Sequence, residues 1–252
     1  MRNNRVGIQV GRIGVVLLAL LGMEAAVRAG LISRLILSAP STVARKSWED
    51  MRTGELWQAI RLSFLEFAVA FVIALVIGMT LGLIFYRFRG VGSAVEPLLL
   101  AFYAAPTILL YPVFLTLFGL ESGAVVSIAV ILGTIPIMVN VRAGLVGVER
   151  IFLKLGRSLR ATRWQMFWKV LLPAATPTIF SGVRLGFTYC LVGVIAVDFL
   201  LFSGGLGRMV SWRYFIFDTE GMYAGIAFVI AIAALVNGLV RRIEDRIRTR
   251  WV

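Results

Sequence analysis

The sequence predicts an all-α integral membrane protein with about six transmembrane helices. Of its 252 residues, 60% are hydrophobic and 15% are charged, whereas a water-soluble domain carries about 25% charged residues. Apolar stretches longer than the roughly 18 residues that mark a spanning helix recur along the chain. Together, these observations exclude a water-soluble globular protein.

Six apolar segments are expected to span the membrane, and turn signals separate most of them. The segments lie near 13–33, 61–86, 96–117, 123–140, 178–202 and 221–240. The turn signals are Ala39-Pro40-Ser41-Thr42, Arg89-Gly90-Val91-Gly92, Gly119-Leu120-Glu121-Ser122 and Ser203-Gly204-Gly205-Leu206-Gly207.

The first segment has some features of a cleaved signal peptide, because Arg2, Arg5 and Arg12 precede an apolar stretch. Glu24 and Arg28 interrupt the small residues that would form a cleavage site. The segment is therefore interpreted as a retained first helix. Residues 1–36 form an N-terminal cytoplasmic tail and this helix, and residues 37–252 form the main transmembrane domain.

Several spans contain residues that disturb or tighten helices. Pro106 and Pro112 lie in the third span and Pro136 in the fourth, where a missing backbone donor kinks a helix. Gly78 and Gly82 form a Gly-x-x-x-Gly pair that lets two helices approach closely. Such residues serve packing in most membrane proteins and line a pathway in some.

The net charge of +13 arises from basic residues at the ends of the apolar segments, and no RNA- or DNA-binding motif accompanies it. If the N-terminus is cytoplasmic, the inside segments 1–12, 87–95, 141–177 and 241–252 hold 17 of the 26 Lys and Arg residues. The positive-inside rule then predicts that both termini are cytoplasmic, and it excludes nucleic acid as the reason for the charge.

The chain contains one cysteine, Cys190, and no histidine. An intrachain disulfide and a His/Cys metal cluster are therefore excluded, and Cys190 is expected to be a small buried hydrophobic residue. No phosphate-cradling P-loop occurs in the sequence. We expect no cofactor, no metal site and no catalytic residue in this chain.

The segment 141–177 is longer than a loop between neighbouring spans requires, and it has its own helical pattern. Amphipathic helices are expected at 150–160 and 163–172, and Pro173 and Pro177 are expected to end the segment before the fifth span. The apolar positions are Ile151, Phe152, Leu155, Leu159, Trp164, Phe167, Trp168 and Leu171. Such a helix pair either lies flat on lipid headgroups or inserts into a groove of a soluble partner.

Residues 156–177, GRSLRATRWQMFWKVLLPAATP, resemble the EAA motif of bacterial ABC importer permeases, which usually reads EAARSLGASRWQLFRKVVLPAALP. The likeness is closest to the nitrate, sulfonate and taurine branch of this type I family. It extends over roughly 37–252 through Pro40-Ser41, Ala105-Pro106, Tyr111-Pro112, Phe118-Gly119-Leu120, Ser203-Gly204-Gly205-Leu206-Gly207 and the basic tail after Arg241.

The resemblance implies a type I ABC importer permease fold in the bacterial inner membrane, with a cytoplasmic loop that docks on separate ATPase subunits. It implies that ATP is bound by those subunits and that a periplasmic or lipid-anchored binding protein delivers the solute. A second permease, identical or paralogous, would complete a dimer. The docking residues would be Arg157, Ser158, Leu159, Arg160, Ala161, Arg163, Trp164, Phe167 and Pro173, with Leu159, Trp164 and Phe167 as anchors.

The loop departs from the family pattern at two places. The Glu-Ala-Ala positions are occupied by Lys154, Leu155 and Gly156, and the usual glycine is replaced by Arg160. Small residues there would permit close docking, so Arg160 is expected to need extra room or a charge partner. The departures are compatible with an altered ATPase pairing, one half of a heteromeric pore, or a drifted paralogue.

Ionisable residues inside spans are costly and are therefore candidates for function. Glu66, Asp198 and Arg184 are such residues, and an internal ion pair or an interfacial position is the alternative explanation. The candidate pathway residues are Glu66, Tyr103, Pro106 and Asp198.

Other functions remain open at this point. A standalone secondary transporter or channel would not need the long amphipathic loop, and a lipid-modifying enzyme should show clustered polar residues that the sequence lacks. An inert scaffold would result if Arg160 abolished coupling. The resemblance suggests a small organic or inorganic anion, such as nitrate, taurine or another sulfonate, or a vitamin precursor as the solute.

Overall fold

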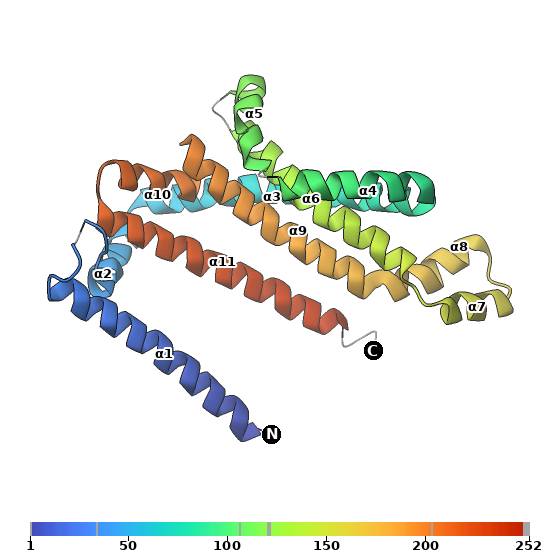
Figure 1. Cartoon of the computed structure of the whole chain (residues 1–252), viewed down its shortest axis with the longest axis horizontal. Coiled ribbons are helices and arrows are strands. Elements are labelled where there is room, and N and C mark those ends of the chain that lie inside the picture. The colour runs from blue at the N-terminus through green and yellow to red at the C-terminus, as the bar shows by residue number, and fades with distance from the viewer. Residues whose placement is uncertain (1, 34, 106, 120–121, 203, 249–252) are drawn as a thin grey trace.

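The computed structural model describes residues 2–248, apart from 34, 106, 120–121 and 203, and these residues form helices joined by short turns (Figure 1). The elements in chain order are α1 (Arg2–Arg28), α2 (Pro40–Met51), α3 (Gly54–Arg87), α4 (Arg89–Ala104), the 3₁₀ segment η1 (Thr107–Leu110), α5 (Tyr111–Phe118), α6 (Ser122–Val146), α7 (Arg150–Ser158), α8 (Arg163–Gln165), the π-helical segment η2 (Met166–Leu171), α9 (Leu172–Leu201), α10 (Gly205–Phe215) and α11 (Thr219–Arg248).

Four helical runs among the described residues are long and apolar enough to cross a membrane: α3, α6, the run that contains α9, and α11. A fifth span results if α4 and the segment η1–α5 are counted together. The all-α membrane fold is thereby confirmed. The predicted first span, near 13–33, overlaps the second half of α1, and it stays a prediction.

The third predicted span, 96–117, is wrong as a continuous helix. α4 ends at Ala104, and the axis of the segment after Thr107 is bent from it by 85°. The sequence explains the break, because a proline disfavours helical geometry in the residue before it and cannot donate a backbone hydrogen bond. Pro112 lies in the first turn of α5, where a proline is tolerated, whereas Pro106 lies outside the described residues.

The predicted stop at Pro173 and Pro177 is also wrong. α8, η2 and α9 follow one another without an intervening turn, so the second amphipathic segment runs directly into the long helix that was expected to begin near residue 178. Pro173 lies in the first turn of α9, directly after the π-helical segment η2, and Pro177 is accommodated inside the helix.

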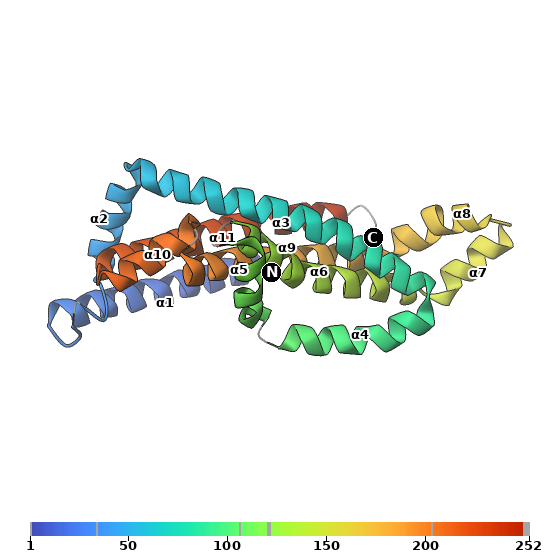
Figure 2. The same cartoon turned by 90° about the horizontal axis from the view of Figure 1, so that it is seen from above.

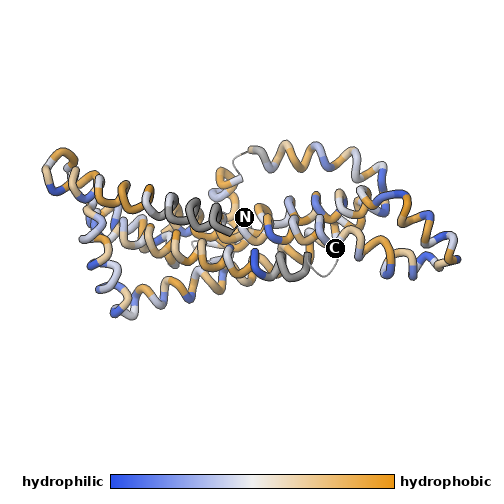
Figure 3. The backbone as a smooth tube through the Cα atoms, turned by 90° about the horizontal axis from the view of Figure 1, so that it is seen from below, coloured by the Kyte–Doolittle hydropathy of each residue, from blue (hydrophilic) through white to orange (hydrophobic). Residues whose placement is uncertain are grey.

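The two ends of the helix bundle are formed by different elements. α2 and the turn from α10 to α11 lie at one end, and α7 and α8 project beyond the opposite end (Figures 1 and 2). α1 begins and α11 ends on the side away from α2. Hydrophobic residues predominate along the long helices, and hydrophilic residues are more frequent in α2 and in the α7–α8 region (Figure 3).

α6 is the central helix, because it packs against α3 on one side and α9 on the other. The Gly78 and Gly82 pair of α3 permits the first contact. A methyl group added at Gly78 would lie 2.8 Å from Cβ of Ile137, and one added at Gly82 would lie 2.6 Å from Cβ of Val141. The structure thus assigns this glycine pair to helix packing.

α9 approaches α6 through glycines as well. A methyl group at Gly186 would lie 2.5 Å from Cγ1 of Ile137 and 2.7 Å from the carbonyl oxygen of Gly133. Cys190 is fully buried in the same layer, and its thiol lies 3.4 Å from the carbonyl oxygen of Ala129. The expectation that Cys190 is a small buried hydrophobic residue is confirmed.

The tight α6–α9 contact predicts that Gly186→Ala destabilises the protein by about 1–3 kcal/mol, because the added methyl group overpacks a backbone–backbone approach. The matched control is Gly238→Ala in α11, where nothing lies within 4 Å of the new methyl group. That change should instead stabilise the helix by about 1 kcal/mol. Thermal unfolding midpoints in detergent measure both effects, and a Gly186→Ala midpoint at or above the wild-type value would contradict the packing argument.

Candidate functional site

The segment between α6 and α9, residues 147–171, folds into a helical hairpin that we call the α7–η2 loop. α7 forms the first arm, and α8 with η2 forms the second. Gly156 is buried where the arms meet, and a methyl group there would lie 2.6 Å from Cε of Met166. The small residue at this motif position therefore allows the two arms of the loop to pack against each other.

The turn after α7 is closed by a Schellman motif. The amide of Ala161 donates to the carbonyl of Gly156 at 3.0 Å, and the amide of Arg160 donates to the carbonyl of Arg157 at 2.9 Å. In this motif the residue after the helix cap adopts the left-handed conformation, and Arg160 has φ of +50°. Glycine adopts that conformation without steric cost, so the usual glycine of the motif is explained by the backbone of this turn.

The second arm begins with a capping box. The amide of Gln165 donates to Oγ1 of Thr162 at 3.3 Å, and the amide of Thr162 donates to Oε1 of Gln165 at 2.9 Å. These bonds satisfy backbone donors at the helix start, which would otherwise be open to solvent. The turn between the two arms is thus fixed from both sides.

The loop presents apolar side chains to its surroundings. Leu159 is 75% exposed and Trp164 is 71% exposed, and both lie beside the turn between the arms. The rings of Trp164 and Trp168 lie 5.4 Å apart. The exposed loop face comprises Ile151, Phe152, Leu155, Leu159, Trp164 and Trp168.

A groove of about 420 Å³ runs between α7 and the start of α9. Leu159 and Pro173 both line this groove, so these two predicted docking residues contribute to one surface. The other lining residues are Phe152, Leu155, Gly156, Lys169, Val170, Ala174 and Pro177.

Phe167 differs from the other predicted anchors. Its side chain is half-buried and packs against the apolar core of the helix bundle, and its ring meets that of Trp168 edge-on at 5.3 Å. An anchoring contact of Phe167 with a partner therefore stays a prediction. Its apolar character is explained by the attachment of the loop to the bundle.

The basic residues of the loop point outward. Arg157, Arg160 and Arg163 are all exposed, as is Ser158, whose hydroxyl donates to the carbonyl of Lys154 at 3.1 Å. Within the described part of the chain, no carboxylate lies within ion-pair distance of the three arginines. Arg160 thus has ample room, and the described residues offer it no charge partner.

The structure places two of the four candidate pathway residues close together. Glu66 of α3 is 3% exposed and Asp198 of α9 is fully buried, and Asp198 and Ser122 are the polar groups beside Glu66. The hydroxyl of Ser63 donates to Oδ2 of Asp198 at 2.9 Å. Neither carboxylate oxygen of Glu66 makes a hydrogen bond within the described residues.

The glycine-rich turn before α10 covers this acidic cluster. Gly205 has φ of +65°, and a methyl group there would collide with Oδ2 of Asp198 and Oγ of Ser63. The amide of Leu206 donates to Oγ of Ser63 at 2.9 Å. This contact explains the glycine at position 205 of the Ser-x-Gly-Leu-Gly pattern. Sequence reasoning missed Ser63, although it lies one helical turn before Glu66.

The other two pathway candidates lie elsewhere. Tyr103 of α4 packs beside Phe85 and Met138, and its ring meets that of Tyr189 edge-on at 5.4 Å. Its hydroxyl is buried without a hydrogen-bond partner among the described residues. Pro106 lies outside the described residues.

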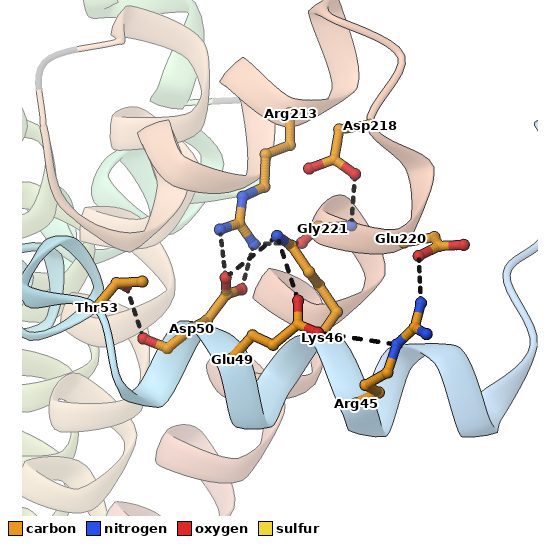
Figure 4. Close-up of polar contacts among 9 residues, drawn as sticks. All are labelled: Arg45, Lys46, Glu49, Asp50, Thr53, Arg213, Asp218, Glu220 and Gly221. Carbon is orange, nitrogen blue, oxygen red and sulfur yellow. Dashed lines mark hydrogen bonds and ion pairs between the residues drawn. The ribbon is translucent and has the colours of Figure 1, made fainter.

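A polar network at the α2 end was also missed from the sequence (Figure 4). The guanidinium of Arg213 forms a bidentate pair with Asp50, with distances of 2.5 and 2.9 Å, and donates to the carbonyl of Gly221 at 2.8 Å. Arg45 lies 3.8 Å from Glu220. These contacts hold α2 to α10 and α11, and because Asp50 and Arg213 are 163 residues apart, no local pattern indicates the pair.

The chain is similar to known proteins over most of its length. The family described as Binding-protein-dependent transport system inner membrane component matches residues 58–249. The taurine transport system permease protein TauC of Escherichia coli is 26% identical over 226 residues, which cover 88% of this chain and 82% of TauC. The riboflavin transport system permease protein RibX of Chloroflexus aurantiacus is 27% identical over 216 residues, which cover 86% of this chain and 80% of RibX.

A chain from a solved structure of the MetNI methionine ABC transporter, in inward-facing conformations, is similar in fold. The TM-score is 0.61 at 20% sequence identity, and the similarity covers 77% of this chain and 94% of that chain. The described helices therefore follow an arrangement already observed in a transporter of this kind.

The Schellman turn predicts that Arg160→Gly stabilises the α7–η2 loop by about 1 kcal/mol, because glycine relieves the left-handed backbone. Chymotrypsin cleavage near Leu159 and Trp164 should slow about fivefold if cleavage follows local opening. The control Lys154→Gly, inside α7, should speed cleavage by a similar factor. Faster cleavage of Arg160→Gly would contradict the assignment.

Proposed function

Because the chain belongs to the family of binding-protein-dependent transport system inner membrane components, we propose that its α7–η2 loop docks on a separate ATPase subunit and that its spans form one side of a solute pathway. The family and the fold identify the chain as a transmembrane permease subunit of an ABC importer. The type I ABC importer permease fold predicted from the sequence is confirmed.

The exposed loop face supports docking on a protein partner. Leu159 and Trp164 protrude at the end of a hairpin that projects beyond the helix bundle (Figure 1). Large apolar and aromatic side chains ringed by arginines are typical of interface anchors, and the planar guanidinium pairs well with carboxylates of a partner. The pre-organised turn lowers the entropic cost of binding. The exposure of Leu159 and Trp164 at the end of the hairpin is the observation that carries the proposal.

The continuous helix from α8 to α9 supports coupling between the loop and the spans. α9 crosses the bundle as a single helix after η2, so a displacement of the loop moves α9 as a nearly rigid body. π-helical segments frequently occur at functional sites, and η2 lies where the loop joins the span. ATP would be bound and hydrolysed by the partner subunits, since the chain has no P-loop.

The packing of α6 supports a pathway on the outside of the three-helix layer formed by α3, α6 and α9. Apolar side chains fill the interior of this layer, so solute must pass along one of its faces. A second permease chain, either identical or paralogous, would close that face. This arrangement supports a dimer of permease subunits in the bacterial inner membrane.

The names of the relatives support a proposal for the class of solute. TauC and RibX are named for taurine and riboflavin, and we propose that the solute here is a small organic or inorganic anion or a vitamin precursor. A periplasmic or lipid-anchored binding protein would select it and deliver it to the α2 end of the bundle.

The docking proposal predicts that the double variant Leu159→Ala/Trp164→Ala loses the ATPase. Truncating a buried aromatic anchor costs about 2 kcal/mol or more, so the two changes should weaken association more than 30-fold. Co-purification of the ATPase subunit with the tagged permease from membranes measures the loss. The control Ile216→Ala/Phe217→Ala removes equally exposed side chains from the opposite end and should leave association unchanged. Full ATPase retention by the first variant would refute the proposal.

We propose that both termini and the α7–η2 loop are cytoplasmic, which the charge distribution supports, as do the start of α1 and the end of α11 on the side away from α2, where α7 also lies. Ser158→Cys, in a chain produced without its ATPase, should react with a membrane-impermeant maleimide only from the cytoplasmic side. Thr53→Cys, beside α2, should react only from the outside. Fully buried Cys190 provides a low background. The reverse pattern would invert the proposed topology.

A further inference from the structure

A partly buried ion pair and a hydrogen bond join α4 to α6 near the end of the bundle that carries the α7–η2 loop. The guanidinium of Arg142 in α6 pairs with the carboxylate of Glu96 in α4, and Nη2 donates to Oγ of Ser93 at 3.0 Å. The two charged side chains are 16% and 20% exposed. A methyl group at Gly92 would lie 2.7 Å from Nε of Arg142, so the guanidinium lies directly across the first turn of α4.

α4 has two further attachments to the layer: the chain itself, since only Phe88 separates α3 from α4, and a small apolar cluster. Val95, Leu99 and Tyr103 pack around a cluster formed by Phe85 of α3 with Ile135 and Met138 of α6. Leu99 and Tyr103 lie further along α4, away from the loop, whereas Val95 is next to Glu96. Arg142 therefore provides the charged contact between α6 and the beginning of α4.

The position of Arg142 links two parts of the molecule. It is one helical turn before α6 ends at Val146, and only residues 147–149 separate that end from α7. α4 in turn leads into the 85° break before η1 and α5. In transporters, broken helices of this kind commonly lie at the solute pathway, where freed backbone groups face a cavity.

We propose that Arg142 is a positioning residue that transmits movement of the α7–η2 loop to the broken span formed by α4, η1 and α5. Separating Arg142 from Glu96 would leave two charges unpaired in a poorly solvated site, so α4 follows α6 when the loop moves. The low exposure of both side chains and the additional bond to Ser93 distinguish this pair from surface ion pairs, which contribute little. The inference rests on the proposed function, since it requires an ATPase to move the loop.

A distance measurement tests the inference without knowledge of the solute. Spin labels are placed at Leu98→Cys in α4 and Leu185→Cys in α9, both exposed positions, in the permease–ATPase complex reconstituted in lipid. We expect the distance between the labels to change when MgATP and vanadate are added to the wild-type pair. Glu96→Gln, which keeps the side-chain shape, should abolish that change while the ATPase stays bound.

Two further variants separate positioning from general stability. The exchanged pair Glu96→Arg/Arg142→Glu should restore the ATP-dependent distance change, because it restores opposite charges across the same contact. Asp50→Asn removes the partner of Arg213 at the other end of the bundle, and it should lower thermal stability without affecting the distance change.

The outcomes distinguish this inference from the proposed function. Failure of the wild-type permease to bind any ATPase would overturn the proposed function. A bound ATPase together with an α4 movement that survives Glu96→Gln, or with no α4 movement in the wild type, would overturn the role of Arg142 alone.

Discussion

The close contact of α6 with α3 and α9 is the constraint on which the rest of the structure depends. Glycines on α3 and α9 remove the side chains that would hold the three helices apart, and Ile137 of α6 contacts glycines on both sides. Backbones at this distance gain dispersion contacts that a looser arrangement would lose, which matters in lipid, where no hydrophobic effect drives helices together. The three helices therefore behave as one layer.

The connections of this layer explain how movement could spread through the molecule. Both ends of the α7–η2 loop are attached to the layer, through the end of α6 and through the continuous helix η2–α9. Phe167 adds an apolar contact between the loop and the core. The loop and the layer are thus mechanically one unit, and α4 is joined to this unit by the chain connection at Phe88, by an ion pair and by one small apolar cluster.

Much of the fold could be predicted from the sequence because hydropathy and glycine spacing act locally. The spans around α3, α6 and α11, the amphipathic loop and the Gly78–Gly82 packing pair all follow from such patterns. The break between α4 and α5 could not be placed, since proline permits either a kink or a full turn, and tertiary contacts decide between them. The predicted end of the loop at Pro173 was wrong, because a proline occurs both just after a helix and in the first turn of a helix, and Pro173 is in the first turn of α9.

The site was predicted less completely, because its polar contacts join residues far apart in the chain. The count of basic residues accounted for the arginines only as markers of the cytoplasmic side. It gave no reason to pair Arg213 with Asp50 or Arg142 with Glu96. The acidic residues Glu66 and Asp198 were recognised by their unusual location in spans. Ser63 and the turn at Gly205, which hold Asp198, become evident only when α3, α9 and α10 are brought together.

Two positions at which the loop departs from its motif, Gly156 and Arg160, are explained by the fold of the loop. Gly156 faces Met166 within the loop, and Arg160 occupies the left-handed position of the turn, so both motif positions serve the fold of the hairpin itself. An arginine at the glycine position costs about 1 kcal/mol in backbone energy. The hydrogen bonds of the Schellman turn and the Thr162–Gln165 capping box offset this cost. The side chain of Arg160 remains exposed and adds positive charge beside Leu159 and Trp164. The departure therefore changes the charge of the exposed surface beside Leu159 and Trp164, while the backbone shape of the turn is the one that the usual glycine would adopt.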